Sequence, residues 1–200
     1  MNLRSKFAAT LIVIFISLIA FGQTNKTVMD HLNVPGPIVL NKNTYNLTWS
    51  SHPSTNYYKQ EYLGAKEKIE RYNKMVMVEV LIGDAKPLDL ATAKINELKQ
   101  MKQTNPVVNY DVFQKNGEIL LDFLLSENTA DGKISILERN VYRYKAFTDK
   151  NGNKGVMMFA ASERSYGNEA DSFLVNLKKN KSVLMNAVAA FTIPEVSIKK

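Results

Sequence analysis

Residues 107–126 read VVNYDVFQKNGEILLDFLLS, and this stretch decides the fold. Two runs rich in β-forming residues, 107–113 and 118–126, flank Asn116-Gly117. Asn-Gly between apolar runs is a strong signal for a short hairpin, because both residues accept the positive φ that the turn needs. A second hairpin of this kind is predicted from 134–147 to 155–163, with Asn-Gly again at its tip. The sequence therefore predicts a sheet made of consecutive antiparallel strands.

Further strands are predicted before this region. Residues 38–40 and 45–49 flank a turn-forming Asn-Lys-Asn and suggest another hairpin. Residues 57–63 (YYKQEYL) and 75–82 (MVMVEVLI) are rich in aromatic and β-branched residues, which favour strands.

Two helices are predicted from apolar residues that recur at helical spacing. One covers about 88–103, and the other covers 168–190 with an interruption near Asn180. Residues 65–72 are predicted to form one or two helical turns. Because strands apolar on both faces need a cover on each side, we predict one α+β domain over 37–198. Its mainly antiparallel sheet would lie between the two helices as an α/β/α sandwich.

The N-terminus is typical of a cleavable secretory signal peptide. Arg4 and Lys6 precede an uncharged apolar run over 8–20, and Ala20 and Gly22 suit the site that a signal peptidase cuts. The run is shorter than the roughly 20 apolar residues of a spanning helix, and an uncleaved anchor is the alternative. No cysteine follows it, so the chain is not expected to be a lipoprotein. We expect a signal peptide over 1–22, a flexible lead-in over 23–36, and a periplasmic or secreted mature chain without a transmembrane segment.

Composition narrows the classes of partner. The full chain carries a net charge of +7, and loss of Arg4 and Lys6 would lower it by two, to +5. The remaining basic residues are scattered rather than gathered on one face, which argues against nucleic-acid binding. The chain has no cysteine, so an exported form would depend on packing rather than on disulfides.

Three acids interrupt otherwise apolar strands and are the first candidates for chemistry: Glu79, Asp122 and Glu138. An acid in such a position is costly unless it is paired or hydrogen-bonded. If two of them met, they could form a general acid–base pair. The favoured alternative is that they meet cationic side chains across the sheet, with Arg139, Arg143 and Lys59 as candidates.

Aromatic residues on the predicted strands are the second group of candidates. Tyrosine and tryptophan combine an apolar body with a polar tip, so they serve both cores and binding surfaces. Sheet packing is the favoured role, and a binding groove is the alternative. The candidate ligand-binding residues are the three acids together with five aromatic residues: Trp49, Tyr58, Tyr62, Tyr142 and Tyr144.

Other catalytic and metal motifs find little support. The chain has only His31 and His52 and no cysteine, which nearly excludes a zinc site of the usual composition. The loop that begins at Asp149 lacks the glycine and the final glutamate of a calcium loop. His52 follows two serines, but no Gly-x-Ser-x-Gly motif accompanies it. No glycine-rich phosphate cradle occurs, and we predict no metal and no cofactor.

Three segments carry a resemblance to a group of uncharacterised exported bacterial proteins. They are NYYKQEYL at 56–63, NPVVNY at 105–110 and ILLDF at 119–123. The order of elements also resembles the PsbP-like α/β/α sandwich. That resemblance implies a binding or accessory role, but it carries over no site residues.

These features together favour a non-enzymatic binding or accessory domain of the cell envelope, with an unknown protein or small molecule as its partner. One alternative is a hydrolase-type enzyme that uses the strand carboxylates. The other is a structural protein attached to the envelope surface.

Overall fold

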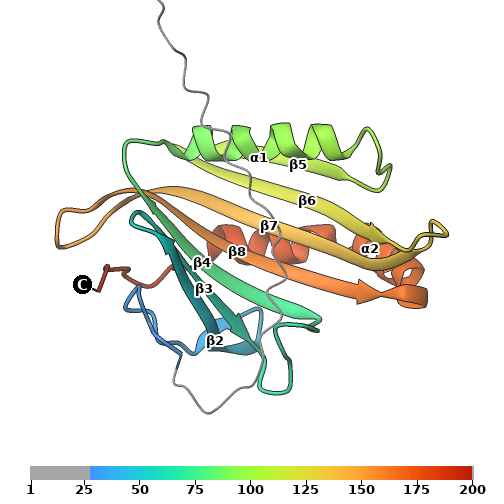
Figure 1. Ribbon diagram of the computed structural model, residues 1–200, viewed down its shortest axis with the longest axis horizontal. Helices are drawn as coiled ribbons and strands as arrows, with labels where there is room; N and C mark the ends of the chain where they lie inside the picture. The colour runs from blue at the N-terminus through green and yellow to red at the C-terminus, as the bar shows by residue number, and fades with distance from the viewer. Residues whose placement is uncertain (1–27, 200) are drawn as a thin grey trace, which may run out of the picture.

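The computed structural model describes residues 28–199, which form one curled antiparallel sheet with two helices (Figure 1). The expected signal peptide over 1–22 lies outside the described residues. The eight strands stand in the order β1-β2-β3-β4-β8-β7-β6-β5. Their bounds are β1 Ile38–Leu40, β2 Asn43–Ser54, β3 Tyr57–Leu63, β4 Lys74–Ile82, β5 Asn109–Lys115, β6 Glu118–Asn128, β7 Ile134–Thr148 and β8 Lys154–Tyr166. The predicted α+β class with a mainly antiparallel sheet is confirmed.

The Asn-Gly hairpin forms as the sequence predicts. Asn116 and Gly117 have φ angles of 52° and 78°, the left-handed region that this turn requires. β5 and β6 pair on either side of it, from Lys115 opposite Glu118 to Asn109 opposite Leu124. The chain then continues into β7 and β8, so four strands follow each other as neighbours in the sheet.

The two helices pack on opposite faces of the sheet. Helix α1 (Pro87–Met101) buries Ala91 and Leu98 in a cluster with Tyr144 and Met158, and this side is called the α1 face. Helix α2 (Ala170–Ala190) packs Leu184 and Val188 against the other side, called the α2 face. Figure 1 shows α1 along the β5–β6 side of the sheet and α2 beside β7 and β8. Among residues 28–199, no helix has both the length and the apolar character that crossing a membrane requires.

Helix α2 contains the interruption that the sequence indicated. Asn180 has φ −121° and ψ 19°, outside the helical region. Directly after it, the carbonyl oxygen of Lys181 accepts a hydrogen bond from the Arg139 side chain at 2.6 Å. A strand side chain thus supplies a donor where the helical bond pattern is broken.

Two local predictions need correction. Residues 65–72 form turns and one β-bridge between Lys68 and Arg71 instead of helical turns. Residues 28–36, expected to be part of a flexible lead-in, pack on the sheet, with Leu32 and Val34 buried in the core. Polar residues around them hid this role, because only two apolar side chains in the segment point inward.

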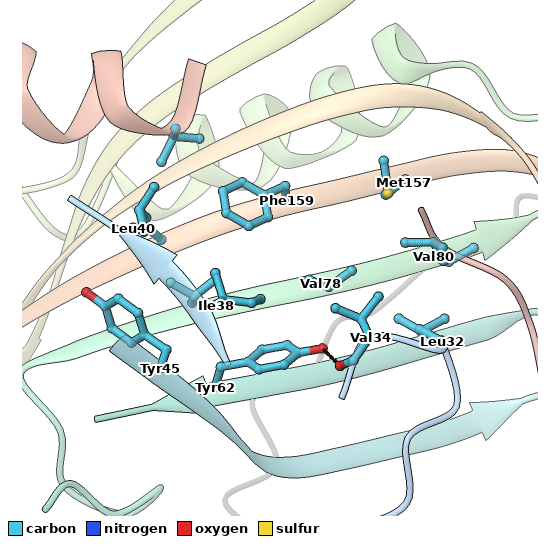
Figure 2. Packing of buried hydrophobic residues seen from close by; sticks show 14 of the residues in the cluster. Leu32, Val34, Ile38, Leu40, Tyr45, Tyr62, Val78, Val80, Met157 and Phe159 are labelled. Atoms are coloured by element: carbon cyan, nitrogen blue, oxygen red, sulfur yellow. Dashed lines mark hydrogen bonds between the residues drawn. The ribbon is translucent and has the colours of Figure 1, made fainter. Parts of the chain in front are cut away.

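The N-terminal segment is held on the α2 face by a buried hydrogen-bond network. Gln60 on β3 accepts the N–H of Leu32 at 2.9 Å and donates to the carbonyl of Val34 at 3.2 Å. The Tyr62 hydroxyl donates to that same carbonyl at 2.6 Å, as Figure 2 shows. The C-terminal segment joins them, because Ser197 N–H donates to the carbonyl of Leu32 at 3.0 Å.

Candidate functional site

Asp122 is bound in a structural ion pair on the α2 face. It lies on β6, and Arg139 on β7 meets it with two parallel hydrogen bonds, Nε to Oδ1 at 3.0 Å and Nη2 to Oδ2 at 2.8 Å. Both residues are buried. With its carboxylate occupied by this guanidinium, Asp122 has the structural pairing that sequence reasoning favoured.

Glu138 is likewise occupied, but on the α1 face. Its carboxylate accepts hydrogen bonds from Ser162 Oγ at 2.6 Å and Tyr72 Oη at 3.1 Å. Arg164 Nη2 lies 2.9 Å from its other oxygen, and the same guanidinium stacks over the Tyr72 ring, 4.2 Å from the ring centroid. This acid therefore holds β7, β8 and the segment before β4 together.

Glu79 differs from the other two acids because tyrosine hydroxyls surround it. It lies on β4, and both Tyr57 on β3 and Tyr142 on β7 donate to its carboxylate, the latter at 3.2 Å. Its cross-strand neighbour is Lys59 on β3. No salt bridge to Glu79 occurs within residues 28–199, although the side chain is buried.

The surroundings of Glu79 form a partly open surface, which we call the β2–β4 face. It comprises the α1-face side chains Trp49, Tyr57, Lys59, Glu61 and Glu79, and Tyr142 borders it. Trp49 on β2 stands opposite Glu61 and is 37 % exposed. The Lys59 ammonium lies 2.7 Å from Glu61, and its side chain is 27 % exposed.

Helix α1 leaves the β2–β4 face largely uncovered. It packs against β5, β6 and β7. At the other end of the same face, Tyr72 and Ile69 from the segment between β3 and β4 pack over Leu63, Met75 and Met77. The polar side chains of the β2–β4 face lie between these two covers.

Burial and the nearby carboxylates shift the pKa values of this surface. Burial and then the negative charge of Glu79 raise the Tyr57 pKa far above its usual value, and the same causes raise that of Tyr142. Desolvation lowers the Lys59 pKa, but the carboxylates of Glu79 and Glu61 outweigh it, so the net shift is upward. At neutral pH both tyrosines are donors and Lys59 is a cation.

The three acids do not converge. Asp122 faces the side of the sheet opposite to Glu79 and Glu138. Glu79 pairs across the sheet with Met158, which in turn pairs with Tyr144 on β7. Glu138 lies six residues before Tyr144 along the same strand. Six residues of strand correspond to about 20 Å.

The predicted aromatic residues also divide between the two faces. Tyr142 and Tyr144 lie on the α1 face with ring centroids 5.9 Å apart. Tyr58 and Tyr62 lie on the α2 face, where both are buried in the core. A single groove lined by all four tyrosines therefore does not form. Trp49 belongs with the α1-face group.

The two histidines come together in the fold, which sequence reasoning did not anticipate. The His31 and His52 ring centroids are 5.8 Å apart, and Tyr58 stacks on His52 at 4.0 Å with an interplanar angle of 8°. The sequence held no signal for this contact, since His52 lies beyond the predicted strand over 45–49 and His31 lies in the predicted flexible lead-in. Their proximity depends on the packing of that segment on the sheet.

The remaining motifs are structural. Asp149 accepts the N–H groups of Asn151 and Asn153, both at 2.9 Å, as an ordinary turn does, and it also accepts Ile198 N–H at 3.2 Å. In the part of the chain that the structure describes, no three His, Asp or Glu side chains gather as a metal-binding group.

Two hollows lie away from the β2–β4 face. One, of about 210 Å³, is bordered by residues 33–39 with Phe191 and Pro194. The other, of about 620 Å³, lies near Arg71, Lys133 and Tyr166 at the far end of β8. Neither contains any of the residues that the sequence singled out.

Comparison with known proteins places the chain in a family but assigns no activity. No curated protein matches it. No solved structure matches it either, so the resemblance to the PsbP-like sandwich is not confirmed. The sequence model of an uncharacterised protein family matches residues 32–193, which is most of the 200-residue chain, and the protein belongs to that family.

Proposed function

We propose that this protein is an exported, non-enzymatic binding domain of the cell envelope that contacts its ligand through the β2–β4 face. The observation that carries the proposal is the contrast among the strand acids. Asp122 and Glu138 are neutralised by arginines, whereas Glu79 lies beside a half-open surface with tyrosine and lysine donors.

The chemistry of this face suits a polar ligand that also has an apolar surface. Trp49 offers an aromatic plane at 37 % exposure, and Lys59 offers a cation whose raised pKa keeps it charged. Aromatic side chains with a few fixed polar groups are the usual composition of ligand sites. The hydrolase alternative has less support, because the acids lie apart and two of them are bound in ion pairs.

The first test uses Trp49, the only tryptophan of the chain, as an intrinsic reporter. Fractions of a native envelope extract are titrated into the purified protein while tryptophan emission is recorded. Binding at this face should move the emission to shorter wavelength, since the ligand removes water from the exposed part of the ring. The active fraction should lose its effect on protein carrying Lys59→Ala.

A matched control distinguishes binding at this face from nonspecific binding to the protein. Val183→Ser changes a side chain on α2 that is 49 % exposed and lies on the other face. This variant should respond like the wild type. A fraction that acts equally on all three proteins, or the lack of any active fraction, would contradict binding at the β2–β4 face.

Export is tested separately. The protein is recovered from the periplasm and the medium of its own cells, and its N-terminus is sequenced. Cleavage at the expected site gives a chain that begins at Gln23. A full-length chain that begins at Met1 in the cytoplasm would refute export.

A further inference from the structure

We propose that His31 and His52 form a two-histidine site for a late divalent transition-metal ion such as Cu²⁺ or Zn²⁺. The site lies on the α2 side of β2, where the N-terminal segment packs against the sheet, and so it is separate from the β2–β4 face. The two residues are 21 positions apart in sequence and are the only histidines of the chain.

The separation of the two rings fits a shared ion. An ion bound to an imidazole nitrogen at roughly 2.0–2.1 Å lies about 3.2 Å from the ring centroid. Two rings on one ion then have centroids about 5.2 Å apart at a tetrahedral angle and about 6.4 Å apart at a linear angle. The observed separation of 5.8 Å lies between these limits, with the ring planes tilted by 48°.

His52 is oriented as metal-binding histidines are. Its Nδ1 lies 3.0 Å from the carbonyl oxygen of Tyr57, so it donates its proton there. That bond leaves Nε2 with a free lone pair, and a backbone carbonyl on the other ring nitrogen is the common outer partner of a metal ligand. The stacked ring of Tyr58 keeps the imidazole from rotating. His52 is exposed to solvent, so an ion can reach it.

His31 is positioned by the packing of the N-terminal segment. The N-terminal segment is fixed here, since Lys199 N–H donates to the His31 carbonyl at 3.0 Å and the adjacent Leu32 is buried. Its ring nitrogens form no hydrogen bond with any residue in 28–199.

The neighbouring carboxylate does not complete the site. Asp30 Oδ1 accepts the N–H groups of Leu32 and Val34, at 3.2 and 2.9 Å, and Oδ2 lies 2.7 Å from Lys199 Nζ. Two imidazoles thus bind the ion, and water or a donor atom of another molecule fills the other positions. Imidazole nitrogen suits Cu²⁺, Ni²⁺ and Zn²⁺ rather than Mg²⁺ or Ca²⁺.

Calorimetric titration of Cu²⁺ and Zn²⁺ into the full chain, purified without a polyhistidine tag, tests the site. We expect one saturable ion per chain. His31→Ala and His52→Ala should each weaken binding roughly 10–100-fold, at least the loss that removing an outer partner causes. Tyr58→Phe keeps the stacked ring and should bind as the wild type does. Absence of binding, or unchanged affinity in either histidine variant, would overturn the site.

A second measurement needs no variant and so does not depend on folding of the substituted chains. Electron paramagnetic resonance of the wild-type protein with one equivalent of Cu²⁺ counts the coordinated imidazole nitrogens. Two imidazoles on the ion support the shared site. A spectrum with one imidazole or none shows that the ion binds elsewhere and refutes it.

Discussion

Replacing Arg139 with methionine should destabilise the protein strongly, because it leaves the buried Asp122 carboxylate and the partly buried Lys181 carbonyl without a partner. The guanidinium is 2 % exposed and holds the Asp122 carboxylate with two hydrogen bonds. Breaking a buried ion pair from one side costs about 3–5 kcal/mol. The loss of the donor to the Lys181 carbonyl adds about 1–3 kcal/mol.

The companion variant separates the two contributions. Combining Arg139→Met with Asp122→Leu removes both charges and keeps apolar volume, an exchange that is often neutral. Only the Lys181 carbonyl then lacks its donor, so the double variant should lose about 1–3 kcal/mol. The double variant therefore measures a second role of Arg139, which is to donate a hydrogen bond to the interrupted helix.

Urea unfolding followed by Trp49 fluorescence and by circular dichroism measures these free energies. The linear dependence on denaturant gives each value in water. Domains typically have an unfolding free energy of about 5–15 kcal/mol, so the loss expected in the single variant brings it close to the limit of folding. A loss below about 2 kcal/mol in the single variant, or an equal loss in the double variant, would refute the assignment.

Three further substitutions test other parts of the fold. Tyr62→Phe removes a hydroxyl that donates to a buried main-chain carbonyl and should cost about 1–2 kcal/mol in urea unfolding. Desolvation raises the Asp149 pKa, but hydrogen bonds from Asn153 and from main-chain N–H groups outweigh it, so the pKa lies below its usual 3.8. The carboxylate therefore stabilises the folded protein fully above pH 3.8, and this contribution is lost as the pH falls through the lower folded pKa. Replacing it with Asn should flatten the loss of stability below pH 3.8, and an unchanged acid profile would contradict this. Gly155→Ala places a Cβ 1.9 Å from the Leu81 carbonyl oxygen and should cost about 1–3 kcal/mol or more, whereas Gly64→Ala, with its nearest contact at 3.7 Å, serves as the tolerated control in thermal unfolding.

Local signals in the sequence account for much of the fold. Asn116-Gly117 adopts the predicted turn, and the interruption at Asn180 falls where the helical pattern weakens. Residues 65–72 mislead, because so short a helix is marginal on its own, and the segment instead forms turns and a bridge between Lys68 and Arg71. Leu32 and Val34 were missed since two apolar residues among polar ones make no periodic pattern.

The location of the candidate site could not be predicted from the strand patterns alone. Alternation shows that Tyr57 and Tyr58 point to opposite faces, but not which face a helix covers. The arrangement places Tyr58 in the core and Tyr57 beside Glu79. The contact between His31 and His52 needs the packing of a segment that no local preference predicts.

The contacts between residues 30–32 and 197–199 also determine when folding can finish. Lys199 reaches Asp30 across 169 positions of the chain, and Ser197 binds the main chain at Leu32. Closing so long a loop costs conformational entropy before the contacts form, so we expect them to form late in folding. During synthesis, the segment around Leu32 is made well before residues 197–199, so its native environment is complete only after those residues have emerged. Until then we expect the apolar surface of β3 and β4 beneath this segment to stay partly open to solvent, which favours aggregation of the newly made chain.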